Sequence, residues 1–506
     1  MAKATTDTCC LTLPLRLEKW QSDRLEKRFE IARQIYNTLL RFELKKLDRL
    51  KQTEAYKAVI EKLGQPEIQD DPSQKKLLLK QLSELRNKAG FTEYSFKSDI
   101  KDFYKHFNDN IGSSVAVHGI APQVWQAFDR LFYGNGKAVH FKKRDDIKSL
   151  RGYSDSKKSG GVEIMFRGTY IEWKGLKLPI KTDPNNAYET DMLTRKVKYC
   201  RICKQPGKYK THWYVQLMLE GKPTVKKAPD TGKELHPIGK GAVGIDIGPQ
   251  TIAYAAQKEC GLLELADRVE NIEHQKLLLQ RKLDRSRRAT NPDNYNEDGT
   301  IRRGIRLQWK KSKHYLSCQK ELAALQRRQA VIRKIQHNDL ANHLLALGDR
   351  FIVEYMEWQS LAHRAKKTEI SEKTGRYKRK KRFGKSIANK APSMLITTLD
   401  QKLKSRGFDG VTKVPTKLRA SQYNHQLDTY QKKELSQRWN DMPDGNRIQR
   451  DLYSAFLLQH TNEDQTGFDP ITLSQDYPAF VRMHDEVIQH LRHSAKTVAS
   501  MGITRR

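Results

Sequence analysis

The spacing of apolar residues changes twice along the first 220 residues of the chain. Leucines occupy every second position from Leu11 to Leu17, an alternation that predicts a β-strand. Apolar residues beginning with Leu25 and Phe29 then recur at helical spacing to about residue 132. From about 137 to 220 the period returns to two, with Gly, Asn and Asp turns between the runs. We therefore expect an antiparallel β-domain that includes the opening strand, with a helical block inserted between its strands.

The second half of the chain alternates short apolar strands with helical stretches. Strands are predicted at 242–248, at 251–256 and from residue 351, and a helical hairpin fills the span between the last two. A helix near 392–405 and a strand near 409–414 follow. Because strands separated by helices are typical of an α/β domain, we expect a multidomain α+β protein. The expected segments are 1–17 (first strand of the β-domain), 18–132 (helical domain), 133–225 (β-domain), 226–241 (linker), 242–260 (α/β domain, first part), 261–347 (helical hairpin), 348–416 (second part, with a basic loop at 364–385), 417–445 (a polar element) and 446–506 (third part and tail).

The charge of the chain indicates a polyanionic partner. The 506 residues include 95 Lys and Arg against 59 Asp and Glu, a formal charge of +36. Self-repulsion at this level disfavours a compact state unless a polyanion relieves it, and nucleic acid is the leading candidate. A membrane partner is not expected, because no apolar run approaches the roughly 20 residues that span a bilayer.

The cysteines indicate neither a disulfide scaffold nor a zinc site. Six cysteines are spread along the chain, and Cys200 and Cys203 form one CxxC pair. No second CxxC or His pair completes four ligands, so zinc is not expected. The N-terminus lacks the long apolar stretch of a secretory signal peptide. We therefore expect a reducing, cytoplasmic location.

Three acidic residues stand at positions where a carboxylate needs a partner or a function. Asp246 interrupts the apolar strand Ala242–Gly248, where an unpaired charge is costly unless it meets a metal or a cation. Glu354 ends the strand that begins at Phe351, where it could equally face water, and Glu357 competes for the same role. Asp451 lies early in a predicted helix, where ordinary pairing with the helix dipole is the alternative.

Taken together, the three acids indicate a divalent metal site. Mg²⁺ prefers hard oxygen ligands and is usually held by one or two carboxylates plus phosphate oxygens. Two such ions roughly 3.5–4 Å apart can activate water and stabilise the leaving oxygen in phosphodiester hydrolysis. Asp246, Glu354 and Asp451 could converge on such a site, although their spacing alone does not show that they do.

The motifs around these acids resemble a known family. Val-Gly-Ile-Asp246-Ile-Gly, Ile-Val-Glu354 and Arg450-Asp451-Leu-Tyr-Ser-Ala, in this order and with a helical insertion after the first, resemble the three split motifs of a RuvC nuclease. The arrangement is similar to the TnpB proteins of transposons and to their descendants, the compact type V CRISPR effectors. The resemblance covers about residues 242–506. It extends less specifically to Phe132–Lys142, at the entry of that family's β-barrel wedge domain.

The resemblance carries further implications for fold and function. It implies an RNase H-like nuclease domain, a wedge β-barrel, and a recognition role for the helical domain. It also implies a guide RNA and a double-stranded target DNA that is unwound into an RNA–DNA hybrid. The expected activity is a Mg²⁺-dependent, RNA-guided DNA endonuclease in the prokaryotic cytoplasm, associated with the nucleoid. The resemblance implies Asp246, Glu354 and Asp451 as its catalytic and metal-binding residues, with two Mg²⁺ ions, or Mn²⁺, as cofactor.

One part of the chain departs from the family pattern. Members usually carry a zinc ribbon with paired CxxC motifs between the second and third nuclease motifs. Here that interval, 417–445, contains no cysteine. The corresponding target-loading element is therefore expected to be metal-free, altered or lost.

Basic residues gather in two zones that could bind nucleic acid. One lies around the helical hairpin and the other in the loop at 364–385, where a solvated loop is the alternative. Trp309 and Tyr315 could stack on bases or simply pack the hairpin. The candidate binding residues are Arg285, Arg287, Arg288, Arg302, Arg303, Lys310, Lys311, Lys378, Arg379, Lys380, Lys381 and Arg382.

Two other functions compete with an RNA-guided nuclease. A non-catalytic, RNA-guided DNA-binding regulator would keep the same architecture, bind tightly and hydrolyse nothing. A guide-independent, structure-selective nuclease would cleave branched DNA without RNA. The sequence leaves open the origin of the guide, transposon or CRISPR, and also the flanking motif and the oligomeric state.

Overall fold

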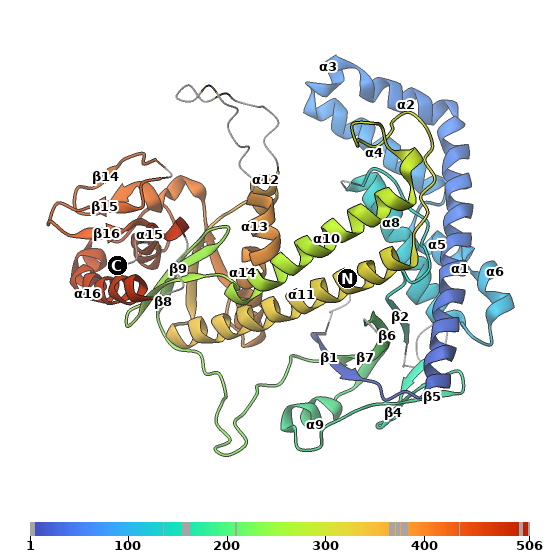
Figure 1. The fold of residues 1–506 in the computed structure, drawn as a ribbon, viewed down its shortest axis with the longest axis horizontal. Helices are drawn as coiled ribbons and strands as arrows, with labels where there is room; N and C mark the ends of the chain where they lie inside the picture. The colour runs from blue at the N-terminus through green and yellow to red at the C-terminus, as the bar shows by residue number, and fades with distance from the viewer. Residues whose placement is uncertain are drawn as a thin grey trace. The chain divides into compact units, whose positions relative to one another are not determined.

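The computed structural model describes residues 6–134, 136–153, 162–207, 210–363, 370, 375, 383–434, 436–494 and 499–503. The chain divides into two compact units, Met1–Val225 and Lys226–Arg506 (Figure 1). Each unit has its own hydrophobic core: one large cluster in the first, and two clusters in the second.

The β-domain of the first unit consists of two antiparallel sheets. Four strands pair in the order β1-β7-β6-β2 and three in the order β3-β4-β5. Leu11 pairs with Leu217 and Leu13 with Val215, which confirms that the opening strand joins the later β-domain. The strands are β1 (Thr8–Pro14), β2 (Ser149–Tyr153), β3 (Ile164–Phe166), β4 (Tyr170–Trp173), β5 (Leu176–Pro179), β6 (Val197–Pro206) and β7 (Thr211–Glu220).

The closed barrel expected for this domain is wrong. Among the described residues no strand pairing closes the two sheets into one; a bridge between Leu15 and Ile180 and a few backbone hydrogen bonds, such as Glu163 N–H to the Tyr153 carbonyl, join them. Helix α1 (Lys19–Gln52) contacts both sheets instead, and the indole of Trp213 on β7 donates to the Ser22 hydroxyl at 3.0 Å. The Arg28 guanidinium donates to the carbonyl of Trp173 on β4 at 2.6 Å. Because the apolar face of this helix fills the space between the sheets, further strand pairing is not needed to bury their inner faces.

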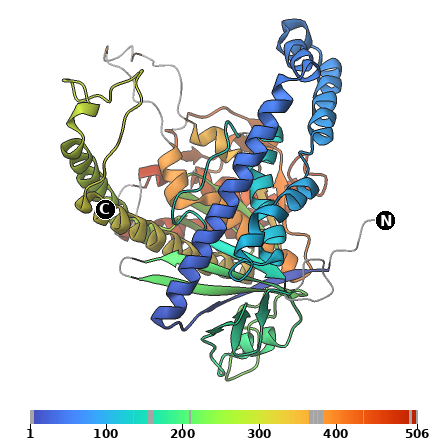
Figure 2. The ribbon, with the colours of Figure 1, turned by 90° about the vertical axis from the view of Figure 1, so that its right-hand side faces the viewer.

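The helical block follows the predicted pattern from residue 19 to residue 133. The long α1 is seen along its whole length in Figure 2, and α2 and α4 pack on each other near its far end. Helices α5 and α8 pack through Phe91, Phe96 and Phe128, which are fully buried. The remaining elements are α2 (Glu54–Gly64), α3 (Pro66–Gln69), α4 (Pro72–Lys88), α5 (Glu93–Asp99), α6 (Lys101–Tyr104), α7 (Ser113–Val115), a π-turn (Ala116–Ile120), α8 (Ala121–Tyr133) and α9 (Ala187–Leu193).

A mixed five-stranded sheet forms the centre of the second unit. Its order is β10-β9-β8-β11-β12; β8, β9 and β10 are antiparallel neighbours, whereas β11 runs parallel to both β8 and β12. Strand β10 lies at the start of a span predicted to be helical. It forms because Gly261 and Leu262 are buried and pair with β9 across a short turn. The strands are β8 (Ala242–Ile247), β9 (Thr251–Ala255), β10 (Cys260–Glu264), β11 (Arg350–Glu354) and β12 (Val411–Val414).

Helices cover the two faces of this sheet. Helices α11 (Lys313–Leu347) and α14 (Pro392–Ser405) share a core with Val243 and Ile245. Helices α15 (Arg450–Gln459) and α16 (Pro470–His493) share the other core with Ala253 and Ala255 (Figure 1). Since side chains alternate along a strand, one face of β8 meets α11 and α14 and the opposite face meets α15.

The predicted helical hairpin is formed by α10 (Glu270–Thr290) and α11, which pack side by side. The other elements of this unit are α12 (Trp358–Ala362), α13 (Phe383–Lys390), β13 (Tyr423–Asn424), β14 (Thr429–Tyr430), β15 (Trp439–Asp441), β16 (Arg447–Gln449) and a final 3₁₀ turn (Ala499–Met501). No helix in the described parts of the chain is both long enough and apolar enough to cross a membrane.

Candidate active site

Asp246 lies on β8 at the contact with α15. A Cβ atom on Gly244, two residues earlier on the same face, would stand 2.0 Å from the carbonyl oxygen of Ala455 in α15. The helix can therefore approach β8 only because this position has no side chain. Side chains two apart share a face, so Asp246 also faces α15.

Glu354 is the last residue of β11, the parallel neighbour of β8. The register pairs Ile352 with Gly244 and Val353 with Ile245, and one further step sets Glu354 level with Asp246. Both carboxylates therefore stand at the carboxyl ends of adjacent parallel strands. A cavity beside Glu354 is lined in part by Ile247 and Lys413.

The sequence offers two acids for this position, Glu354 and Glu357. Glu357 follows the strand, just before α12, and is exposed. Only Glu354 continues the β11 register beside Asp246.

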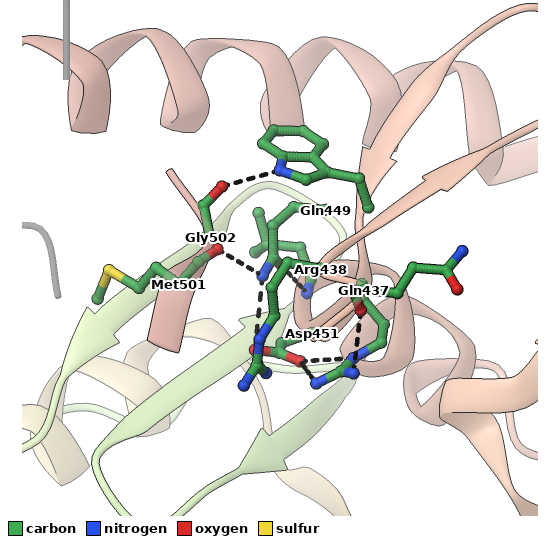
Figure 3. Close-up of polar contacts among 9 residues, drawn as sticks. Gln437, Arg438, Gln449, Asp451, Met501 and Gly502 are labelled. Atoms are coloured by element: carbon green, nitrogen blue, oxygen red, sulfur yellow. Dashed lines mark hydrogen bonds and ion pairs between the residues drawn. The ribbon is translucent and has the colours of Figure 1, made fainter. Parts of the chain in front are cut away.

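Asp451 lies in the first turn of α15, one helical turn before Ala455. The Arg450 guanidinium donates to Oδ1 of Asp451 at 3.1 Å, and Arg438 stands 3.7 Å from Oδ2 (Figure 3). Asp451 thus comes with its own cations, whereas Asp246 has none at ion-pair distance among the described residues. The helix start that sequence reasoning placed here is correct, since Gln449 is its N-cap.

The electrostatics of the site are dominated by Asp246. Burial, and then the negative charges of Asp451 and Glu354, raise its pKa to about 8, and Arg450 opposes this only in part. The Ser454 hydroxyl also lowers the pKa of Asp246, although it is buried and makes no hydrogen bond of good geometry. Burial raises the pKa of Glu354 as well. Both other acids therefore act on Asp246, and Arg450 does not cancel their effect on its pKa.

The donor chemistry of this site fits a hard divalent cation, but the arrangement is not a closed cage. In the described parts of the chain, no group of three or more His, Cys, Asp or Glu side chains is arranged to hold a metal ion. Mg²⁺ commonly uses one or two carboxylates together with water and phosphate oxygens. Asp246 and Glu354 could supply two such carboxylates. Asp451 could do so as well if it exchanged its arginine partners for the cation.

Several residues at this site were missed by sequence reasoning. Arg438, Gln449 and Ser454 all contact or influence the acids, and none was singled out as functional. Gln449 could have been found as the polar residue directly before the helix start. Arg438 could not, because only the pairing of β15 with β16 brings it beside Asp451.

Part of the predicted basic zone is engaged inside the helical hairpin. Arg287 lies over the ring of Trp309 at 5.3 Å, and Arg288 over that of Tyr295 at 5.1 Å. Both also pair with Asp284, at 2.9 and 3.0 Å. These contacts favour the interpretation of Trp309 as a packing residue and make the two arginines part of the hairpin structure.

The other candidate basic residues have fewer side-chain contacts than Arg287 and Arg288, so they are freer to bind nucleic acid. Arg302 donates to the carbonyl of Tyr295, and Lys311 lies over the ring of Tyr315 at 5.6 Å. Arg285 and Arg303 are exposed and have no side-chain partner among the described residues, and the exposed Lys310 uses only its backbone. Residues Lys378, Arg379, Lys380, Lys381 and Arg382 lie outside the described residues.

Aromatic packing holds the cysteine-free element at 417–445. Tyr423 stacks on Phe468 with ring centroids 4.9 Å apart, and Nδ1 of His425 lies 2.7 Å from the Tyr453 hydroxyl. Burial lowers the pKa of His425 to about 4, so this imidazole is neutral. Cys200, of the CxxC pair, is buried in β6, and burial raises the pKa of Cys203 to about 11, as expected for unreactive thiols.

Comparisons with known proteins give distant matches only. No family model matches the chain, and no curated protein matches it. The chain is similar to a solved structure described as the Cas12f1–sgRNA–target DNA complex, with 12% identity, a TM-score of 0.45, and coverage of 91% of this chain and 99% of that chain. A second, a CRISPR-Cas12f ternary complex, gives 12% identity, a TM-score of 0.26, and coverage of 87% and 82%. At these values neither structure assigns a role to any residue of this chain.

Proposed function

We propose that this chain is an RNA-guided DNA endonuclease that hydrolyses phosphodiester bonds at Asp246, Glu354 and Asp451. The observation that carries the nuclease assignment is the environment of Asp246. Burial of this carboxyl, and then the negative charges of Asp451 and Glu354, raise its pKa to about 8. Such an arrangement is costly for folding, and perturbed acids of this kind gather at functional sites.

Mg²⁺ is the proposed cofactor, in two ions, with Mn²⁺ as an alternative. When bound, such ions lower the pKa of an attacking water and stabilise the leaving oxygen. Asp246, Glu354 and Asp451 would hold them, because their carboxylates are hard oxygen donors. A ligand must be deprotonated, so metal affinity should rise with pH as Asp246 loses its proton.

The neighbouring arginines have a supporting role in this proposal. Arg450 and Arg438 neutralise Asp451 in the metal-free protein. This leaves a pair of guanidinium groups beside the acids. They limit the repulsion among three carboxylates until a divalent cation binds.

Guide RNA and target DNA are the proposed partners. The charge of +36 supports a polyanionic partner. The order of the three acidic motifs and the residues in them support membership of the RuvC family. That family in turn supports a guide RNA. In such enzymes base pairing reads the sequence, while the protein reads backbone shape and a short flanking motif.

The test begins with the RNA that co-purifies with the full-length protein, which is sequenced to identify a guide. Wild type and Asp246→Ala are then assayed on DNA that matches this guide, with Mg²⁺ and with EDTA. We expect Mg²⁺-dependent cleavage by wild type and only the EDTA background with the variant. Equal cleavage by both proteins would show that Asp246 is not catalytic.

A nuclease-inactive, RNA-guided DNA-binding regulator is the second candidate. It is favoured by the engagement of Asp451 with Arg438 and Arg450, and by the lack of a preformed three-ligand group among the described residues. A regulator would bind matched DNA tightly and in a salt-sensitive manner without hydrolysis in Mg²⁺, Mn²⁺ or any other divalent ion. Hydrolysis in any one of them excludes it.

A further inference from the structure

Gln449, the residue before α15, is completely buried, and both polar atoms of its side chain are hydrogen-bonded. Its Oε1 accepts from the backbone N–H of Leu452 at 2.8 Å, which caps the helix. Its Nε2 donates to the carbonyl of Met501 at 3.2 Å and reaches Oδ2 of Asp451 at 3.4 Å (Figure 3). One side chain therefore links the helix start, the C-terminal turn and a candidate metal ligand.

A buried histidine holds the backbone of Gln449. The Gln449 N–H donates to Nε2 of His484 at 2.9 Å, and Nδ1 of His484 stands 2.9 Å from Oδ1 of Asp485. Because an N–H group can only donate, Nε2 must carry the lone pair and Nδ1 the proton. His484 is 1% exposed, so this neutral tautomer has no competing water.

The C-terminal turn is attached to the same group of residues. Met501 is 1% exposed, and the Trp439 indole donates to the carbonyl of Gly502 at 2.9 Å. Gly502 has a φ of +67°, and a Cβ there would lie 2.3 Å from Cβ of Arg438. The turn thus packs against Arg438, which itself contacts Asp451.

We propose that Gln449 is a positioning residue that orients the Asp451 carboxylate for a divalent cation, with the Met501 carbonyl fixing the amide. This inference rests on the proposed function, in which Asp451 is a metal ligand. The amide restrains Oδ2 while Arg450 restrains Oδ1, so the carboxylate cannot rotate freely. Outer residues of this kind orient metal ligands, and their loss typically costs about 10–100-fold in metal affinity.

Two variants of Gln449 separate positioning from helix capping. Gln449→Asn keeps a good N-cap residue but is too short to reach Met501 and Asp451, whereas Gln449→Met removes cap and donor together. Mn²⁺ affinity of the RNA-free full-length protein is measured by titration calorimetry, alongside thermal unfolding. We expect both variants to lose about 10–100-fold in affinity and only Gln449→Met to lose stability through the missing cap.

A matched control and a kinetic readout complete the test. Gln329 is 5% exposed and donates to Glu273 on the helical hairpin, so Gln329→Asn makes the same change at another buried Gln–carboxylate contact. It should leave Mn²⁺ affinity unchanged. Guided cleavage by Gln449→Asn should need more Mg²⁺ for half-maximal rate yet recover at saturation, which general structural damage would not allow.

Asp451→Asn separates the positioning role of Gln449 from the metal-binding role of Asp451. If Asp451→Asn loses Mn²⁺ binding while both Gln449 variants stay within about twofold of wild type, the positioning role is wrong and the metal assignment stands. If Asp451→Asn binds Mn²⁺ as wild type does, the assignment of Asp451 fails and the positioning role fails with it. Loss in all three variants supports both.

Discussion

Charged residues have opposite environments in two regions of the second unit. One region is the contact between β8 and α15, and the other is the hairpin of α10 and α11. At β8, the half-buried Asp246 stands beside other acids, and Gly244 allows the backbone of α15 to contact the strand. Along the hairpin, basic residues stay near the surface, and Arg287 and Arg288 are paired with Asp284 and with aromatic rings. The charge of Asp246 has no ion-pair partner among the described residues, whereas the charges of Arg287 and Arg288 are balanced by Asp284.

The difference shows which charges require a functional explanation. An exposed Arg paired with a nearby Asp contributes little free energy and can be explained by local structure alone. A buried carboxyl without a cation destabilises the fold and needs another reason to be present. The candidate active site therefore rests on Asp246, and the basic residues must be sorted one by one.

Gly244→Ala is expected to have the largest effect on this comparison. Its Cβ would overlap the Ala455 carbonyl, which cannot move without shifting α15 away from β8. Overpacking of this kind costs about 1–3 kcal/mol, occasionally more, and the displacement of Asp451 should abolish cleavage. Gly248→Ala is the control, because its Cβ would meet its nearest neighbour at 3.6 Å. Denaturant unfolding and cleavage are measured for both; equal behaviour would contradict the close contact.

Asp246→Asn should change how stability depends on pH. The folded pKa of Asp246 is raised from 3.8 to about 8, so between these values the folded state holds a proton that the unfolded state has released. The free energy of unfolding therefore falls as pH rises through this window. Asp246→Asn does not lose unfolding free energy in this way, because its amide does not titrate. At pH 8 in EDTA, the Tm of Asp246→Asn should exceed that of wild type by roughly 2–4 °C for each kcal/mol of unfolding free energy that wild type has lost. Near pH 4 the two Tm values should be equal.

Mg²⁺ gives the control for this pH effect. A cation that binds only the folded wild type raises its stability, so the gap at pH 8 should narrow with Mg²⁺. A gap that is constant from pH 4 to pH 8 would show that Asp246 keeps an ordinary pKa.

The smallest effects are expected along the hairpin, where two pairs of arginines can be compared. Arg281 and Arg285 are exposed with no side-chain partner among the described residues. Replacing both with Ala should weaken RNA binding and reduce the salt slope by about 0.7–0.9 per lost phosphate contact, with stability unchanged. Replacing Arg287 and Arg288 should instead loosen the segment around Tyr295 and Trp309, which limited proteolysis would detect, and leave the salt slope near that of wild type. The reverse pattern would mean that the engaged arginines are the ones that bind RNA.

The sequence predicted elements well where one local pattern decides the structure. The helix predicted near 392–405 is observed as Pro392–Ser405, and the strand near 409–414 as Val411–Val414. The opening strand was placed about three residues late. Its leucine alternation continues past Pro14, but Leu15 already bridges to the second sheet, so pairing with β7 ends earlier.

The sequence could not predict contacts that join distant parts of the chain. The β-domain is not a closed barrel because α1 covers the space between its sheets. The alternation of apolar residues in the strands does not predict this packing. Likewise, nothing local indicates that His484 and Met501 hold Gln449, because 35 and 52 residues separate them.

By itself, the sequence determined the net charge of the chain, the order of most of its elements and the three acids that are candidates for the site. Composition sets net charge, and apolar period sets local structure, without reference to any distant residue. Only the tertiary structure decided that Gly244 admits α15 to β8, that the β11 register brings Glu354 level with Asp246, and that Arg438, Arg450 and Gln449 surround Asp451. These relations depend on packing and strand register, which arise only when segments far apart in the chain meet.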